Sequence, residues 1–247
     1  MTIGAFTYKG IRSTDFGIIS KSTDRSLLPG MRSNMAQIPG RDGSIDLGDN
    51  TYDNRQIKVH IAFKEKDYEQ LRKKAREIAG WLSSDKYEKL IFDDEEDKYY
   101  LARIYNEMSF NSWFKLGEAD LIFDCQPFAY SEERFVVSEN ITSLREIEIT
   151  NNGTYKAYPL IEVTGTAGSV TLASDGGSFA IKNITEKTIV DCQNQLCYTF
   201  DGLNLKVNKL KDFTGLFICL KPGTLKVAVS GVALNINVRF TLQDVYL

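Results

Sequence analysis

The sequence is short of the residues that many function classes need. Its 247 residues include one histidine and two tryptophans, and no apolar run reaches the roughly 18 residues that span a bilayer. Residues 1–10 lack a basic stretch followed by an apolar core, so we expect no secretory signal peptide and folding in a cytosol. With 30 Lys and Arg against 33 Asp and Glu, the net charge of −3 disfavours a nucleic-acid backbone as a partner. We therefore expect neither a membrane protein nor a sequence-specific nucleic-acid binder.

Catalytic and metal-binding signatures are equally scarce. The sole histidine, His60, alternates with apolar residues, and neither a G-x-S-x-G motif nor a glycine-rich phosphate loop is present. A Ser-His-Asp arrangement in space and a glycosidase pair of carboxylates stay open, with Asp191 as one carboxylate at a strand end. The cysteines form no C-x-x-C pair and are expected to be reduced, partly buried thiols: Cys125, Cys192, Cys197 and Cys219. We predict no catalytic centre, no metal and no cofactor.

One strand and one helix stand out in the first half. In residues 55–63, Ile57, Val59 and Ile61 alternate with polar residues, which predicts a strand with one apolar face. Residues 68–83 place leucine, alanine and isoleucine at spacings of four, three and four, which predicts a helix that covers that face. Asp67 fits the start of such a helix. The lysines and arginines off the stripe are interpreted as a solvated face.

An acidic run separates two further predicted strands. Residues 93–97 are all Asp or Glu, and we interpret them as a solvated hairpin turn. Calcium is the alternative, but the interleaved spacing, the glycine and the distal glutamate of an EF-hand loop are missing.

Residues 29–54 differ from the segments on either side. They are rich in Gly, Asp, Asn and Ser, and Asp42-Gly43 supplies the positive φ angles of a tight turn. We predict a long loop or a hairpin arm here. Arg41 and Asp42 either shape this turn or contact another subunit, and the residues alone leave both interpretations open.

The sequence pattern changes after about residue 140. Short strands alternate with turn residues and no helical periodicity appears, which indicates an antiparallel β-sandwich. We predict domains at residues 1–135 and 140–247, with the junction in the polar segment 130–142. Both tryptophans, Trp81 and Trp113, precede the sandwich, so a galactoside site of the usual galectin composition cannot be assembled in it.

Several segments resemble the distal tail proteins (the Dit family) of long-tailed, non-contractile bacteriophages. The segment 38–43 is followed by a strand that carries Tyr52 and Arg55, as in that family. The other similar segments occur in the family's order: 6–18, 81–82, 90–94, 100–103 and 123–127, and more weakly 152–153, 157–159, 189–192 and 220–223.

The resemblance implies an architecture and a set of partners. It implies a mainly β chain, with an N-terminal β-sandwich or split-barrel-like domain that has one helix and forms a hexameric ring. A galectin-like antiparallel β-sandwich would follow. The ring would join the tail tube protein to a tail-tip fibre or tail-associated lysin protein at the virion tail tip, and would bound the DNA channel. Arg41, Asp42, Tyr52 and Arg55 are the candidate subunit-interface residues.

We weighed three functions for such a chain. The leading prediction is a structural hub without enzymatic activity. The first alternative is a carbohydrate-binding adhesin that contacts the host cell wall, and the second is a wall-degrading hydrolase.

Overall fold

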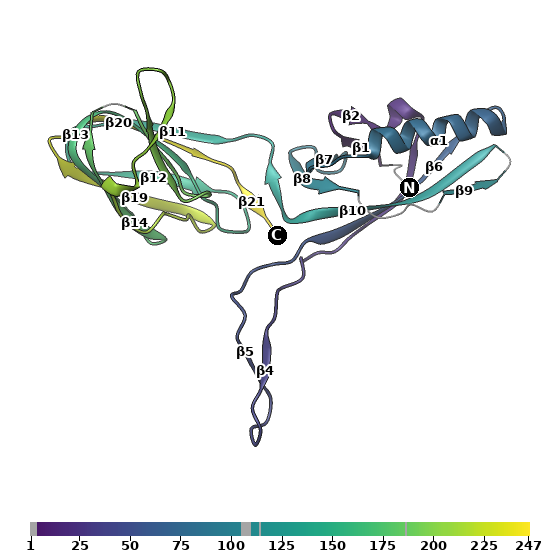
Figure 1. The fold of residues 1–247 in the computed structure, drawn as a ribbon, viewed down its shortest axis with the longest axis horizontal. Helices are drawn as coiled ribbons and strands as arrows, with labels where there is room; N and C mark the ends of the chain where they lie inside the picture. The colour runs from purple at the N-terminus through teal and green to yellow at the C-terminus, as the bar shows by residue number, and fades with distance from the viewer. Residues whose placement is uncertain (1–3, 105–109, 114, 186) are drawn as a thin grey trace. The chain divides into compact units, whose positions relative to one another are not determined.

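The chain folds into two compact units that are mainly β-structure. The computed structural model describes residues 4–104, 110–113, 115–185 and 187–247. The first unit comprises Met1–Tyr130 with Leu247, and the second comprises Ser131–Tyr246 (Figure 1). Residues 135–141, which we expected near a polar junction, form a strand of the second unit. The predicted fold class, mainly β with a single helix, is confirmed.

One antiparallel sheet forms the frame of the first unit. Its strands follow the order β2-β1-β7-β8-β10-β6-β3, and β9 also pairs with β10. The elements of this unit are β1 (Phe6–Tyr8), β2 (Ile11–Arg12), the 3-10 helix η1 (Ser13–Phe16), β3 (Ile19–Arg25), β4 (Met35–Gln37), β5 (Ser44–Asp46), β6 (Arg55–Lys64), α1 (Tyr68–Leu82), β7 (Glu88–Phe92), β8 (Lys98–Arg103), β9 (Phe110–Trp113) and β10 (Leu116–Ser131).

The helix α1 begins and ends as local chemistry dictates. The Asp67 carboxylate accepts a hydrogen bond from the backbone N–H of Gln70 at 2.8 Å, which caps the first turn. Ser83 adopts an extended conformation and ends the helix. Leu71, Ile78 and Leu82 are buried on one face, so burial against the sheet stabilises this helix more than its propensity does. No helix among the described residues is long and apolar enough to cross a membrane.

Trp81 is the centre of the contact between α1 and the sheet. Its ring stacks on Phe16 at 4.6 Å and on Phe6 at 5.8 Å between centroids. Its indole N–H donates to the carbonyl of Tyr8 at 3.1 Å, which satisfies the polar atom of a buried aromatic side chain. Phe6 in turn meets Phe123 of β10 edge-on at 5.8 Å. Aromatic rings therefore connect the helix to strands β1 and β10.

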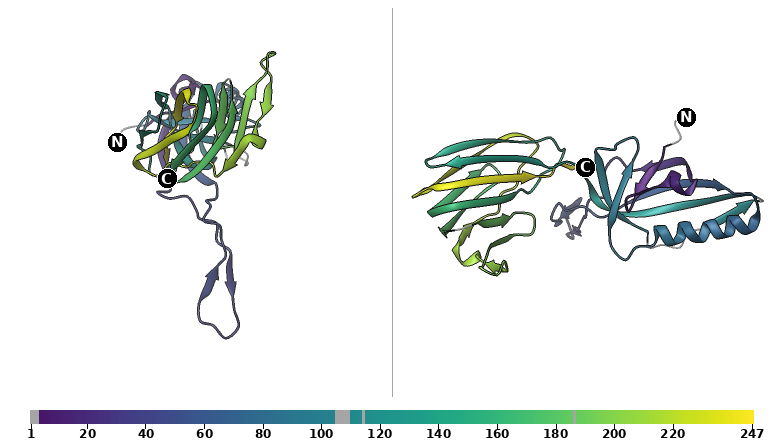
Figure 2. Two further views of the ribbon diagram at one scale, coloured as in Figure 1. Left: turned by 90° about the vertical axis from the view of Figure 1, so that its left-hand side faces the viewer. Right: turned by 90° about the horizontal axis from the view of Figure 1, so that it is seen from above.

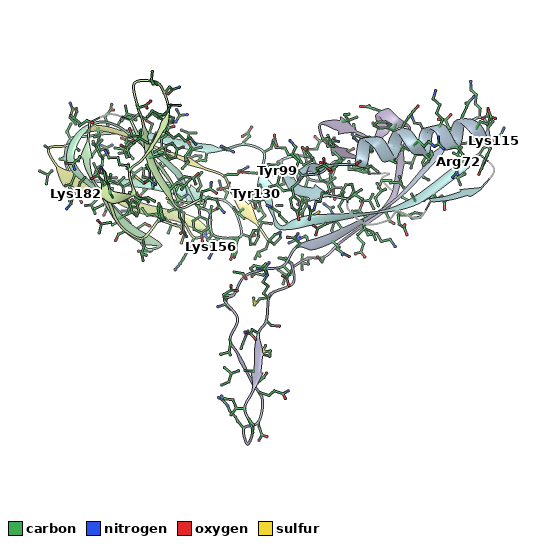
Figure 3. All side chains as sticks on the ribbon, viewed as in Figure 1. Arg72, Tyr99, Lys115, Tyr130, Lys156 and Lys182 are labelled. Carbon is green, nitrogen blue, oxygen red and sulfur yellow. The ribbon has the colours of Figure 1, made fainter. Side chains whose placement is uncertain are left out.

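The long strand β10 connects the apolar core with the end of the first unit. It pairs with β6 from Leu116 opposite Lys64 to Cys125 opposite Arg55. Farther along, the rings of Tyr130 and Tyr99 lie 5.7 Å apart (Figure 3). Burial raises the pKa of Tyr130, which keeps its phenol neutral.

Two antiparallel sheets form the second unit and share one strand, β13. Their orders are β11-β20-β13-β15-β16-β17 and β12-β19-β13-β14-β18. The elements are β11 (Phe135–Ile141), β12 (Arg145–Asn151), β13 (Leu160–Ser174), β14 (Gly177–Ile184), β15 (Thr188–Asp191), β16 (Leu196–Phe200), β17 (Lys206–Asn208), the 3-10 helix η2 (Leu210–Asp212), β18 (Phe213–Gly215), β19 (Gly223–Val232), β20 (Asn235–Leu242) and β21 (Val245–Tyr246).

Gly165 lets β13 pass from one sheet to the other. Before it, Ile161 and Val163 pair with β15 and β20; after it, Val170 and Leu172 pair with β14 and β19. Gly165 has a φ of +119°, and a Cβ there would lie 2.3 Å from the carbonyl oxygen of Asn235. Only glycine combines this backbone angle with so close an approach.

Replacing Gly165 by alanine tests this constraint. We expect Gly165→Ala to lower the free energy of unfolding by at least ~2 kcal/mol, because it adds backbone strain and a clash. The control is Gly168→Ala in the same strand, where the nearest atom to a new Cβ is 3.5 Å away and the change should stay within ~1 kcal/mol. Urea unfolding of both variants measures the difference, and equal effects would contradict the assigned role of Gly165.

Candidate functional site: the arm and its base

A hairpin arm leaves the sheet of the first unit between β3 and β6 (Figures 1 and 2). Near its base, Met31 and Tyr52 form a bridge, and the N–H of Arg32 donates to the carbonyl of Thr51 at 2.8 Å. Farther out, β4 and β5 pair from Met35 opposite Asp46 to Gln37 opposite Ser44. The arm is thus held by its own ladder and closes through residues 38–43, where Gly43 has the predicted positive φ but Asp42 does not.

The tip of the arm contains the Arg41-Asp42-Gly43 turn. Gly40 and Gly43 both have positive φ, and the N–H of Arg41 donates to the carbonyl of Ile38 at 3.1 Å. Arg41 and Asp42 are exposed. Their charged groups take part in no ion pair within the described residues, so both are accessible to another molecule.

Large apolar side chains are exposed along the whole arm. Leu27 is 89% exposed, the most of any large apolar residue described. The others are Leu28, Met31, Met35, Ile38 and Leu47. A two-stranded hairpin has no second layer to cover such residues, and an isolated hairpin is marginally stable in water (Figure 3). The arm therefore has the composition of a surface that becomes buried on association.

A polar network fixes the base of the arm where it meets β6. The Asn54 amide donates to both carboxylate oxygens of Asp124 at 3.1 Å and to the Tyr87 hydroxyl at 2.8 Å. The Tyr87 hydroxyl donates to Asp124 at 2.7 Å, and the Arg103 guanidinium lies 4.7 Å from the Tyr87 ring centre. Burial, followed by the hydrogen bond to Asp124, raises the pKa of Tyr87. Four side chains from four segments thereby hold the chain as it turns out of the sheet.

Arg55 is a buried cation with few partners. Its residue is 4% exposed, its guanidinium lies 5.6 Å from the Tyr100 ring centre, and Nη1 donates to the carbonyl of Ser26 at 3.3 Å. Nε and Nη2 are buried and form no hydrogen bond within the described part of the chain. Leaving buried N–H groups of a charged group unpaired costs stability.

The four predicted interface residues occupy the two ends of the arm. Arg41 and Asp42 lie at the tip, whereas Tyr52 and Arg55 lie at the base. The Tyr52 ring meets Phe128 edge-on at 5.7 Å, so it joins the arm to β10. Asp124 was not predicted as part of this site; its signal is a carboxylate between Phe123 and Cys125, at the end of the apolar run 121–123.

His60 belongs to a polar row on the sheet. Across β3, β6 and β10, Ser22, His60 and Asp120 are direct neighbours, and His60 Nδ1 lies 2.5 Å from Asp120. Lys58 pairs with the other Asp120 oxygen at 3.0 Å, and His60 and Lys58 lower the pKa of Asp120. Ser22 and His60 share no hydrogen bond in the described structure. The row lacks the nucleophile–base contact that a Ser-His-Asp centre requires.

The cysteines are buried or half-buried thiols. All four cysteines are free, and burial raises the pKa of Cys192 to about 12 and that of Cys197 to about 11. Such thiols are poor nucleophiles at neutral pH. Among the described residues, no group of three or more His, Cys, Asp or Glu is arranged to hold a metal ion.

The comparisons with known proteins identify the first unit. Residues 11–125 match the family described as the phage tail protein RIFT-related domain. Residues 11–125 of this chain are thus similar to a phage tail protein domain. The arm, its base and Arg55 all lie within the matched RIFT-related domain. Among curated protein sequences, none matches the chain.

One solved structure shares the fold of the whole chain. The crystal structure of the SPP1 Dit (gp 19.1) protein, described as a paradigm of hub adsorption apparatus in phages that infect Gram-positive hosts, has a TM-score of 0.77 and 18% identity. The match covers 100% of both chains. A structure of the phage P2 baseplate in its activated conformation with Ca has a TM-score of 0.49 and 10% identity, over 99% of this chain and 98% of that chain. The predicted resemblance of this chain to the Dit family is confirmed for the fold.

Replacing Arg55 by methionine tests whether its charge has a partner inside the chain. Methionine keeps an unbranched stem against Tyr100 and removes the unpaired N–H groups. We expect the free energy of unfolding of Arg55→Met to stay within ~1 kcal/mol of the wild type or to rise. Urea unfolding of the isolated protein measures it. A loss above ~3 kcal/mol would show that the charge is well paired in the folded chain.

Proposed function

We propose that this phage tail protein is a hexameric hub at the tail tip of a phage or prophage. It would join the tail tube protein to a tail-tip fibre, baseplate or tail-associated lysin protein and bound the channel for DNA. The observation that carries the proposal is the exposed apolar arm on a phage tail domain. The role is structural, and no step of it requires turnover.

The arm supports association between identical subunits. Its apolar residues are spread over both strands and have no cover in the first unit, so burying them against a second copy is favourable at roughly 25 cal/mol per Å². A contact between the arm of one copy and a different surface of the next is heterologous. Contacts of this kind close into a ring when the rotation per subunit divides a full turn.

The base of the arm is held rigidly, which favours such a contact. Asn54 and Tyr87 hold the strand to Asp124 through hydrogen bonds, and Tyr52 packs on Phe128. An arm fixed at its root loses less conformational entropy when it docks than a free loop would. The buried Arg55 guanidinium lies at the same place against Tyr100 and donates to the carbonyl of Ser26, so it helps to fix the root of the arm.

The net charge is compatible with a channel for DNA. The chain carries −3, and the polar row of Lys58, His60 and Asp120 is charge-balanced. A surface without excess positive charge does not retain a polyanion that must pass it.

Charged residues in the arm test the ring. We expect purified wild-type protein to form hexamers in native mass spectrometry and six-fold rings with a central hole in negative-stain electron microscopy. Leu28→Asp with Leu47→Asp should reduce the hexamer at least ~10-fold, because charges would replace buried apolar contacts. Both residues are exposed, so the melting temperature of the monomer should not change.

A matched control separates the arm from general surface effects. Leu144→Asp changes a leucine of the second unit that is 72% exposed and should leave the hexamer intact. A wild-type chain that stays monomeric at every concentration, even beside its tail tube protein, would contradict the hub.

Replacing Asp42 by asparagine distinguishes the two interpretations of the tip. Asn-Gly suits the same tight turn as Asp-Gly, so Asp42→Asn keeps the turn and removes the charge. If Asp42 contacts a neighbouring subunit through its carboxylate, the dissociation constant of the hexamer should rise several-fold, most at low ionic strength. Sedimentation at two salt concentrations measures this. An unchanged constant would assign Asp42 to the turn alone.

A further inference from the structure

A second exposed apolar surface lies in the second unit, on the hairpin of β16 and β17. This hairpin extends beyond the other strands of the sandwich (Figures 1 and 2). Leu203 at its turn is 81% exposed, and all three residues of β17 are exposed. The further exposed apolar residues of this segment are Leu196, Leu205, Val207 and Leu210.

The turn of this hairpin is built to hold its leucines outward. The Asp201 carboxylate accepts hydrogen bonds from the N–H groups of Leu203 at 2.9 Å and Leu205 at 2.8 Å. The N–H of Asn204 donates to the carbonyl of Asp201 at 2.9 Å, and Asn204 adopts a positive φ of 62°. A turn that uses its aspartate in this way is pre-organised, so the leucines stay in water until something covers them.

The outer edge of β17 offers unpaired backbone groups. The strand stands at the end of its sheet and, among the described strands, pairs with β16 alone. The N–H of Asp201 donates to the carbonyl of Leu205, and the N–H of Lys209 donates to that of Cys197. Residues 205, 207 and 209 therefore direct their backbone groups toward β16. By alternation, Lys206 and Asn208 direct theirs to the open edge.

Alternation also separates the side chains of this edge. Leu205 and Val207 lie on one face of the strand, and Lys206 lies on the other, with its ammonium 4.6 Å from the Tyr198 ring centre. Residues 206–211 contain three lysines and no acidic residue. Lysines on an open edge disfavour pairing with a second copy of the same edge, because like charges would meet.

We propose that the open edge of β17 is a docking site for an extended segment of another protein in which apolar and acidic residues alternate. The segment would add a strand to the sheet. Its backbone would pair with Lys206 and Asn208, its apolar residues would cover Leu205 and Val207, and its carboxylates would face Lys206. The proposal does not rest on the ring, since the site belongs to the second unit alone.

Synthetic strands of about eight residues test the site on the full-length protein. The probes alternate valine with glutamate in one peptide and valine with lysine in the other. We expect the glutamate peptide to shift the backbone amide NMR signals of residues 203–209 and to bind at least ~10-fold more tightly than the lysine peptide. Lys206→Glu should reverse this preference.

Two further variants separate backbone pairing from charge. Lys206→Ala removes the charge alone, whereas Lys206→Pro also removes an edge N–H but leaves the bonds of residues 205 and 207 to β16. We expect the proline variant to bind the glutamate peptide more weakly than the alanine variant. Leu203→Ser with Leu205→Ser should also weaken binding, and Leu144→Ser should not.

Three results would overturn the proposal. The first is no shift at residues 203–209 with either peptide at millimolar concentration. The second is equal binding of both peptides, which would mean an unselective edge. The third is concentration-dependent self-association of the wild type that Lys206→Pro abolishes, which would assign the edge to a second copy.

Discussion

The pairing of β3 with β6 is the constraint on which the arm depends. The register places Arg25 opposite Ile57, so the two strands part just before the arm begins and meet again where it ends. β6 is itself held because its apolar residues are buried on the helix side, within the aromatic core around Trp81. If α1 no longer covered the sheet, the apolar residues of β6 would be exposed. The pairing of β3 with β6 would weaken, and the arm would no longer have a fixed direction. The interaction surface is therefore positioned by a core that takes no part in it.

Regular periodicity made much of the first unit predictable from the sequence. Apolar and polar residues alternate after Arg55, and apolar residues form a stripe along α1. Both patterns predict an element with one buried and one solvent-exposed face, and the structure has both elements nearly where expected. The turn at Asp42-Gly43 also predicted the hairpin, because a positive φ is a local demand. Such features are determined by residues close together in the sequence, so one sequence is enough to predict them.

Features that depend on distant partners were less predictable. The passage of β13 between sheets requires Gly165 to meet the Asn235 carbonyl seventy positions away, which no local pattern indicates. Arg55 begins a strand and looks like a surface cation in sequence, yet it is buried on Tyr100. Asp124 can accept its hydrogen bonds from Asn54 and Tyr87 only because the fold brings these distant residues beside it. The sequence thus indicated the turn at the tip, and the family resemblance indicated Tyr52 and Arg55 at the base, but the network around Asp124 was not predicted.

The two exposed apolar surfaces limit association in different ways. The arm is long and carries exposed apolar residues, and its residues 29–54 contain two arginines against four aspartates, with Arg32 paired to Asp53 near the base. The β16–β17 hairpin is short and combines its leucines with Lys206, Lys209 and Lys211, which outnumber the flanking Asp201 and Asp212. Identical positive edges repel, and an acidic strand of a different protein removes that repulsion as it buries the leucines. In the proposed ring the arm contact is heterologous, so a further surface that also bound copies of the chain would extend the assembly beyond the ring.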